Sequence, residues 1–263
     1  MKDKIRNIAF VGAGNLAWHL APALDNAGYP VREVYSRNER NARQLASRLY
    51  QANVKKDADF AGSDIDVVII AVSDDAIGQV VTDLVLPDDV MVVHTSGSTP
   101  MRVLEATDTE HTGVFYPLQT FSKGVSVNFE DVPILVEGSS PDVERALQTM
   151  ARALSPTVAA ISSERRLALH LAAVFASNFT NHMVTIAFDL MEDHDLDPEW
   201  LKPLIAETLN KSLDAGPVQA QTGPARRGDL GILRRHTEFL KDNPSSREIY
   251  ALISQHILER YQS

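Results

Sequence analysis

The chain begins its first regular segment with Ile8-Ala9-Phe10-Val11-Gly12-Ala13-Gly14-Asn15-Leu16-Ala17. A short apolar run leads into two glycines and then into a helical pattern, which is the G-x-G-x-x-A form of the dinucleotide-binding fingerprint. Gly12 allows a tight turn, Gly14 lets the backbone approach a pyrophosphate, and Ala17 lets the helix pack closely on the strand. Phosphates are expected at the helix N-terminus, where N–H groups and the dipole favour anions. The turn residues are therefore predicted to bind a dinucleotide: Gly12, Ala13, Gly14, Asn15 and Leu16.

A second strand pattern, Val31-Arg32-Glu33-Val34-Tyr35, ends at Ser36 and Arg37. In a site for NAD this strand usually ends in an acid that accepts from the ribose 2′-hydroxyl. Here an arginine is present instead, with Arg40 one helical turn further on. A guanidinium suits a 2′-phosphate because it donates in a planar fork, although both arginines would also suit the solvated face of the next helix. The absence of an acid favours NADP, with Ser36 and Arg37 in the binding site.

The composition limits the class of protein. A chain of 263 residues, 44% of them hydrophobic, can bury a full core and is long enough for two domains. The net charge of -10 argues against a nucleic acid partner, and the lack of cysteine excludes disulfides and thiolate metal sites. Polar residues such as His170 and Asn178 interrupt the apolar stretch 167–190, so no membrane span is expected. We expect a cytoplasmic protein that acts on a small molecule, without a metal, nucleic acid or membrane partner.

Strand and helix patterns alternate along the chain up to residue 161. The continuous apolar run 66–72 has the length of a parallel strand that is covered on both faces. Further strands are predicted at 90–94, 112–115, 133–136 and 157–161, and helices at 38–49, 76–84 and 141–154. Beyond this point the strand patterns stop and long helices follow. The sequence predicts an α/β protein: a doubly wound parallel sheet of the Rossmann type at residues 1–161, followed by an all-α domain at residues 162–263.

In such sheets the ligand lies beyond the carboxyl ends of the strands. Two polar segments fall there besides the glycine turn, namely Ser73–Asp75 and His94-Thr95-Ser96-Gly97-Ser98. We expect Val72 and Ser73 to contact the cofactor, and an acid of the first segment to cap the next helix. The small side chains of the second segment allow close approach of a nicotinamide or substrate, which makes Ser96 a candidate catalytic residue. A well-hydrogen-bonded turn at a strand end would have the same composition.

Polar residues gather on one face of the helix predicted for 163–191. At 100° per residue, six of them fall within an arc of about 140°. They are His170, Ser177, Asn178, Asn181, His182 and Thr185. A polar stripe on an apolar helix must find partners in neighbouring helices or line a cavity. Beside a cofactor domain we favour a substrate-facing stripe, in which Asn178 and His182 address one substrate atom while His170 and Asn181 bind substrate.

The segment Gln221–Asp229 holds two glycines, a proline and the adjacent pair Arg226 and Arg227. Two arginines on a rigid loop can clamp a carboxylate or phosphate, which makes Arg226 a candidate for binding substrate. A turn between helices, with Asp229 paired to an arginine, is the alternative.

The chain resembles, over nearly its whole length, the Rossmann-like NADP oxidoreductases with an uncharacterised helical C-terminal domain. The segments that carry the resemblance are Gly12–Asn15, His94–Ser98, Tyr116-Pro117-Leu118-Gln119-Thr120-Phe121-Ser122 and Thr222–Asp229. This family is related to ketopantoate reductase, pyrroline-5-carboxylate reductase, prephenate dehydrogenase and phosphogluconate dehydrogenase. The resemblance implies NADP as the cofactor, a substrate between the two domains, and a homodimer formed through the helical domain.

One position departs from the related reductases. In ketopantoate and β-hydroxyacid reductases, the first long helix after the sheet presents a catalytic Lys four residues before an Asn. If Asn178 matches that Asn, Val174 stands at the Lys position and cannot transfer a proton. We therefore expect His182 or His170 to donate the proton, because imidazole titrates near neutral pH.

Together these features predict an NADP-dependent reductase of a small, ketopantoate-like oxoacid, with Asn178, His182 and Ser96 as catalytic residues. An imine reductase is one alternative. A deazaflavin:NADP oxidoreductase, which needs no proton donor for a substrate, is another. A non-catalytic NADP-binding sensor is the alternative from a different class, and the missing Lys suits it.

Overall fold

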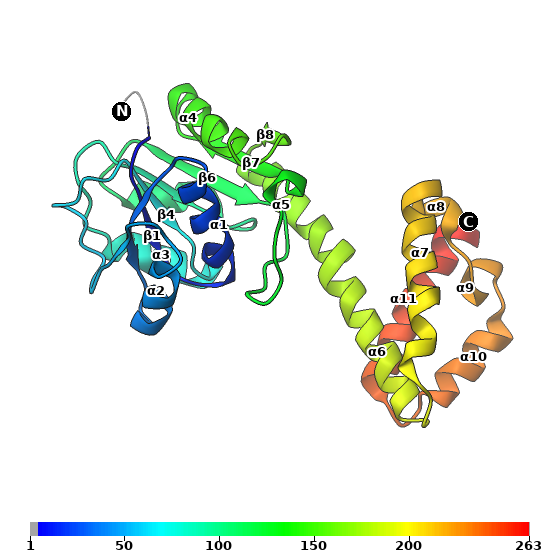
Figure 1. Ribbon diagram of the computed structural model, residues 1–263. Coiled ribbons are helices and arrows are strands. Elements are labelled where there is room, and N and C mark those ends of the chain that lie inside the picture. The colour runs from blue at the N-terminus through cyan, green and yellow to red at the C-terminus, as the bar shows by residue number, and fades with distance from the viewer. Residues whose placement is uncertain (1–4, 263) are drawn as a thin grey trace. The chain divides into compact units, whose positions relative to one another are not determined.

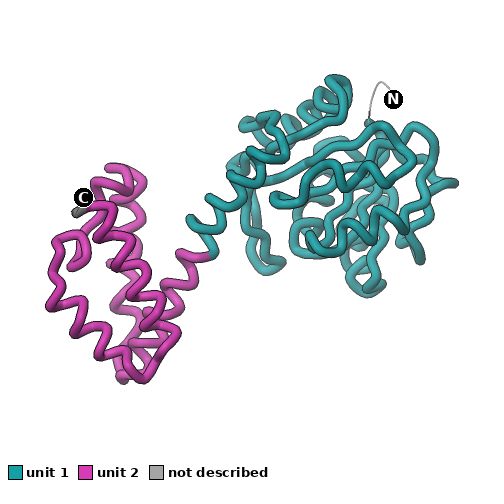
Figure 2. Tube along the Cα trace, turned by 180° about the vertical axis from the view of Figure 1, so that it is seen from behind, with its two compact units in different colours: residues 1–178 teal, residues 179–263 magenta. Residues whose placement is uncertain are grey.

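The computed structural model describes residues 5–262 (Figure 1). The chain divides into two compact units, the first ending at Asn178 and the second beginning at Phe179 (Figure 2).

The first unit is built on one eight-stranded sheet with the strand order β3-β2-β1-β4-β5-β6-β7-β8. The strands are β1 (Ile8–Val11), β2 (Val31–Tyr35), β3 (Asn53–Val54), β4 (Val67–Ile70), β5 (Met91–His94), β6 (Thr112–Pro117), β7 (Ile134–Gly138) and β8 (Val158–Ala160). All neighbouring pairs are parallel except β6 with β7. The order reverses at β1, which pairs with β2 on one side and β4 on the other, and this is where ligands bind in such sheets.

Helices cover both faces of this sheet. They are α1 (Asn15–Asn26), α2 (Glu39–Ala46), α3 (Asp74–Asp83) and α4 (Pro141–Arg152), with the short η1 (Met101–Ala106) and η2 (Phe129–Asp131). Alternate strand residues enter two separate cores: Phe10 packs with residues of α1, α2 and α4, while Val11 packs with residues of α3 and η1. The doubly wound arrangement predicted from the alternating patterns is therefore confirmed.

Two details of the sheet differ from the prediction of parallel strands throughout. The antiparallel pairing of β6 with β7 arises because the chain returns from β6 through the short η2 rather than through a crossover helix, which a parallel neighbour would need. The edge strand β3 has only two residues, which is too short to produce a periodic pattern.

The helix that follows β8 is interrupted. It runs from Ser163 to Glu192 as α5 (Ser163–Ala173), the π-helical segment η3 (Val174–Phe179) and α6 (Thr180–Glu192). Among the described residues this is the one helix that is long and apolar enough to cross a membrane, by length and composition alone. Its first turns pack on the sheet, so the division between the compact units falls after the predicted boundary at 161, where the strands end.

The second unit contains helices and no strand among its described residues, as the predicted all-α domain requires. After α6 come η4 (Pro198–Trp200), α7 (Leu201–Ala215), α8 (Pro217–Ala220), α9 (Pro224–Arg227), α10 (Leu230–Phe239) and α11 (Pro244–Gln262). Residues of α6, α9, α10 and α11 surround an apolar cavity of about 400 Å³ within this unit.

Candidate cofactor and substrate site

A cavity of about 550 Å³ lies at the carboxyl ends of the strands in the first unit. Its lining comes from the turn after β1, the end of β2, the start of α3, the loop after β5, the end of β6 and the helix α5. The sequence-predicted residues among them are Gly12, Ala13, Gly14, Asn15, Leu16, Ser36, Arg37, Val72, Ser73, Ser96 and His170. The structure therefore brings together every residue predicted for the cofactor with two of those predicted for catalysis or substrate.

The two glycines of the turn have different structural roles. Gly12 has a φ of +106°, and a Cβ at this position would lie 2.2 Å from the carbonyl oxygen of Ala71. Its N–H donates to the Tyr35 carbonyl oxygen at 2.7 Å, which joins the turn to β2. A Cβ on Gly14 would meet nothing within 4 Å, because this position faces open space. Gly12 is needed for the fold, whereas Gly14 leaves room for a ligand.

The N-terminus of α1 faces the cavity at this turn. Its N-cap, Gly14, makes no side-chain hydrogen bond, and the first turn of the helix carries no acid. Free N–H groups and a positive helix end are what a phosphate requires. Together with the open space beside Gly14, they fit the pyrophosphate of a dinucleotide.

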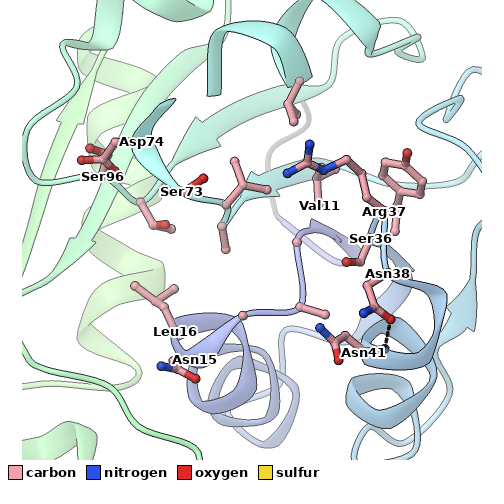
Figure 3. Close-up of a pocket in the computed structure, with 18 of the residues that line it drawn as sticks. Val11, Asn15, Leu16, Ser36, Arg37, Asn38, Asn41, Ser73, Asp74 and Ser96 are labelled. Carbon is pink, nitrogen blue, oxygen red and sulfur yellow. Dashed lines mark hydrogen bonds between the residues drawn. The ribbon is translucent and has the colours of Figure 1, made fainter. Parts of the chain in front are cut away.

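Figure 3 shows Ser36 and Arg37 on one side of the cavity, and Ser96 and Asp74 on the opposite side. Arg37 is exposed and has neither an ion pair nor a hydrogen bond with another described side chain or backbone group. Arg40 is also exposed but is not among the described residues that line the cavity. Among the described residues that line the cavity, Arg37 is the one Lys or Arg side chain, and it is therefore available to an anionic ligand.

The loop after β5 is held by its own hydrogen bonds. The hydroxyl of Ser96 donates to Thr99 Oγ1 at 3.0 Å and accepts from the N–H groups of Ser98 and Thr99 at 3.1 and 2.9 Å. These bonds use its proton and both lone pairs. The Ser98 hydroxyl donates to Asp74 at the start of α3, so this acid holds the loop. The expected capping of α3 by an acid is wrong, because the N-cap is Ser73 and no side chain makes a capping hydrogen bond there. Ser96 lines the cavity while it shapes the loop.

His94, at the end of β5, is fully buried behind this loop. Its Nδ1 accepts from the Ser96 N–H at 3.2 Å, so the ring is neutral with its proton on Nε2. The pKa of His94 is lowered to about 4: burial is the largest cause, the Arg166 guanidinium acts in the same direction, and Asp74, Glu137 and the Pro100 backbone oppose them. This histidine supports the loop and does not line the cavity.

Tyr116 and His170 meet at the cavity, next to Gly97. The Tyr116 hydroxyl lies 3.0 Å from Nδ1 of His170. A Cβ on Gly97 would approach that nitrogen to 2.5 Å and Tyr116 Cζ to 2.7 Å, so the loop backbone packs directly on the pair. Burial raises the pKa of Tyr116, Asp74 raises it further, and Arg166 opposes them. Sequence reasoning missed Tyr116 as a site residue, although its position at the end of a predicted strand could have indicated it.

The other residues predicted on the long helix for catalysis or substrate binding lie outside this cavity. Asn178, Asn181 and His182 are exposed on the long helix and are not among the described residues that line this cavity. A π-helical segment lies between His170 and His182 and turns by a different angle per residue than an α-helix. The polar face calculated at 100° per residue therefore does not apply across this segment.

Arg226 belongs to the second unit, where its guanidinium stacks on the Tyr261 ring with its carbon 4.3 Å from the ring centroid. Its neighbour Arg227 forms an ion pair with Asp229 at 2.8 Å, as the structural alternative for this loop predicted. In this unit both arginines contact other parts of the chain, and α9 ends at Gly228 in a left-handed conformation.

Family models match both parts of the chain. Residues 7–97 match the family described as NADP oxidoreductase coenzyme F420-dependent, and residues 132–257 match a domain of unknown function, DUF2520. A search of the curated proteins finds no match.

Several solved structures are similar over nearly the whole chain. A protein from Bacteroides fragilis, provisionally assigned as an NADP oxidoreductase, is 39% identical with a TM-score of 0.88, over 97% of this chain and 98% of that one. An imine reductase from Myxococcus stipitatus in complex with NADP+ is 14% identical with a TM-score of 0.69, over 98% and 100% of the chains. A pyrroline-5-carboxylate reductase from Coxiella burnetii is 16% identical with a TM-score of 0.58, over 98% of each chain. The last two share the fold.

Proposed function

Because the chain belongs to the family of NADP oxidoreductases, we propose that it transfers hydride between NADPH and a small carbonyl or imine acid. The observation that carries this proposal is the cavity that joins the glycine turn to Arg37 at one end and to Ser96, Tyr116 and His170 at the other. One lining therefore holds both phosphate-binding features and polar groups able to contact a reacting substrate.

The residues of the cavity suggest how the cofactor is held. The turn from Gly12 to Leu16 would bind the pyrophosphate, and Ser36 and Arg37 would bind the 2′-phosphate. Val72 and Ser73 also line the cavity. NADPH supplies the hydride when it is bound, while the protein orients the reactants and supplies the proton.

The substrate class is proposed from the neighbours and from the polar lining. An imine reductase and a pyrroline-5-carboxylate reductase share the fold. We therefore include imine acids as candidate substrates, together with 2-oxoacids such as ketopantoate. Of the two histidines considered as proton donors, His170 lines the cavity and His182 does not. Asn178, Asn181 and Arg226 stay candidates for holding the substrate's acid group.

The proposal is tested with the purified full-length protein. NADPH and NADH oxidation are followed at 340 nm over a panel of small 2-oxoacids and cyclic imines, with ketopantoate first. We expect turnover of at least one compound, with NADPH strongly preferred. Tight NADPH binding without oxidation across the panel would contradict the proposal and favour the non-catalytic sensor. Equal use of NADH would contradict the assignment of Arg37.

A deazaflavin is the second candidate for the hydride partner. It is favoured by the match of residues 7–97 to a family described as coenzyme F420-dependent. Hydride exchange between a deazaflavin and NADP needs no donor that protonates a substrate carbonyl. Rapid exchange that survives replacement of His170, Asn178 and His182 would support this function over reduction of an oxoacid.

We propose that the active form is a cytoplasmic homodimer. Large apolar side chains are exposed on this chain: Leu167 is 48% exposed, Leu171 54%, Leu213 84% and Leu252 73%. Large apolar side chains left in water favour an interface, and a second copy would cover them. The chain has a mass of 28.9 kDa, and light scattering without detergent should give twice that value. A monomer that needs detergent to stay in solution would contradict both the dimer and the absence of a membrane partner.

A further inference from the structure

We infer that Tyr116 is the catalytic proton donor of this site and that His170 is the positioning residue that returns the proton to it. The inference rests on the proposed reductase function and names the residue that completes it. Both side chains line the cavity that contains the glycine turn, and their polar atoms are 3.0 Å apart.

The two side chains come from separate elements that are each held firmly. Tyr116 lies near the end of β6, paired with Leu135 of β7. His170 lies one helical turn after Arg166 on α5, so the two share a face of that helix. Arg166 is buried and is bonded to Glu137 of β7 and to the Thr99 carbonyl oxygen. This anchor fixes the helix and thereby the position of the imidazole against the phenol.

The backbone of the loop after β5 closes on the pair from the third side. Gly97 leaves no space for a Cβ against His170 Nδ1 or Tyr116 Cζ, and its φ lies outside the left-handed region. The glycine is therefore required by the close approach and not by the backbone conformation. The same loop reaches the cavity through Ser96.

The charges around the pair favour a neutral, protonated phenol. Burial and the Asp74 carboxylate raise the pKa of Tyr116, and the Arg166 guanidinium lowers it. His94 behind the loop is neutral at physiological pH because burial lowers its pKa to about 4. Among the described residues, the groups that act on or contact Tyr116 are Asp74 on α3 and Arg166 and His170 on α5. Tyr116 thus retains its proton in the range where cells work and can donate it.

The step balances with one hydride and one proton. As the substrate carbon accepts hydride from NADPH, its carbonyl oxygen or imine nitrogen takes the Tyr116 proton. The phenolate oxygen takes the proton from His170 Nδ1 while Nε2 of the half-buried ring takes one from the solvent, so the imidazole stays neutral and the net reaction consumes one solvent proton. The resting pair therefore has Nδ1–H of His170 donating to the Tyr116 oxygen, whose own O–H points to the substrate.

The test compares Tyr116→Phe and His170→Gln with the wild-type protein, and uses Tyr50→Phe, which removes an exposed phenol, as the matched control. We expect Tyr116→Phe to lower kcat by about 10²- to 10³-fold and KM to change by less than about threefold. His170→Gln should lower kcat by about 10- to 100-fold and shift the basic limb of the pH profile, where the Tyr116 phenol loses its proton. NADPH binding, followed by fluorescence, should stay within about threefold of wild type in both variants.

Two measurements without turnover complete the test. Ultraviolet titration of the cofactor-free protein, as the difference between wild type and Tyr116→Phe, should show a phenol whose pKa is above the ordinary value for tyrosine. Its midpoint should move in His170→Gln. Nitrogen NMR should find the His170 proton on Nδ1.

The inference is overturned if Tyr116→Phe retains a third or more of kcat, or if it loses NADPH binding in proportion to kcat. Loss of turnover in His182→Ala together with full activity in Tyr116→Phe would assign the proton to His182. If no compound is turned over, the proposed function fails. Even without turnover, a Tyr116 titration midpoint that does not change in His170→Gln would contradict the proposed coupling of these two side chains.

Discussion

The guanidinium of Arg166 forms an ion pair with the carboxylate of Glu137, and the arginine side chain is only 1% exposed. The Glu137 carboxylate also accepts two hydrogen bonds from Ser163, one from its N–H group at 3.0 Å and one from its hydroxyl at 2.8 Å. A charge pair taken out of water needs further hydrogen bonds to offset the loss of its hydration. This pair joins α5 to β7 and to the loop that ends at Thr99. It explains why the first turns of the long helix belong to the sheet unit.

Removing the carboxylate should therefore destabilise the first unit. In Glu137→Gln the buried guanidinium loses its counter-charge, and we expect unfolding to be easier by about 3–5 kcal/mol. Arg145→Met, which breaks the exposed pair with Asp142, is the control and should cost less than about 1 kcal/mol. Urea unfolding measures both. Equal costs for the two variants would mean that the buried pair has no special part in holding α5.

The two glycines of the turn should respond in opposite ways to alanine. Gly12→Ala places a Cβ 2.2 Å from a backbone oxygen at a φ of +106°, so we expect a loss of more than about 2 kcal/mol of stability. Gly14→Ala has open space at a φ of -78° and should change stability by less than about 0.5 kcal/mol. Its methyl group enters the phosphate site, so NADPH binding should weaken by more than about tenfold. Unchanged NADPH binding in folded Gly14→Ala would remove the pyrophosphate from this turn.

Most of the fold could be predicted because its strands are buried on both faces. The run Val67–Ile70 is fully buried, and a continuous apolar run of that length has few other structures open to it. The direction of β7 could not be predicted, because side-chain periodicity identifies a strand but not whether it runs parallel to its neighbour. The π-helical segment Val174–Phe179 also carries no sequence pattern that distinguishes it from the α-helix around it.

The candidate site was predictable where local motifs determine it. The glycine turn and Arg37 follow from residues adjacent in sequence to predicted strands. Tyr116 could not be assigned in the same way, because its role depends on His170, a partner 54 residues later on another element. Contacts over that separation depend on tertiary packing, which a single sequence does not specify.

Arg37 and Arg40 offer a matched pair for testing the cofactor. Both are exposed, but only Arg37 is among the described residues that line the cavity. In Arg37→Ala the 2′-phosphate loses its charge-assisted hydrogen bonds, so the Kd for NADPH should rise by about 10- to 100-fold. The Kd for NADH, which lacks this phosphate, should hardly change, and Arg40→Ala should affect neither. Fluorescence titration gives all the values. Equal weakening of NADPH by both variants would point to general electrostatic attraction instead of a specific contact.

The stability of the protein should depend on the protonation of His94. Its pKa is about 4 in the folded state against 6.5 ordinarily, so the unfolded chain takes up a proton first as the pH falls. The stability that comes from the neutral buried ring is therefore fully present above pH 6.5 and is lost as the pH falls towards 4. The full shift corresponds to about 3 kcal/mol.

His94→Asn isolates this effect, because its amide oxygen can replace Nδ1 as the acceptor for the Ser96 N–H but does not titrate. The free energy of unfolding in urea, measured at intervals from pH 7 to pH 4.5, should fall more steeply for the wild-type protein than for the variant. The surface carboxylates titrate in both proteins, so their contribution cancels in the difference. Parallel curves for the two proteins would show that the folded protein accommodates a charged ring at this position. That result would contradict the expectation that the buried His94 ring stays neutral.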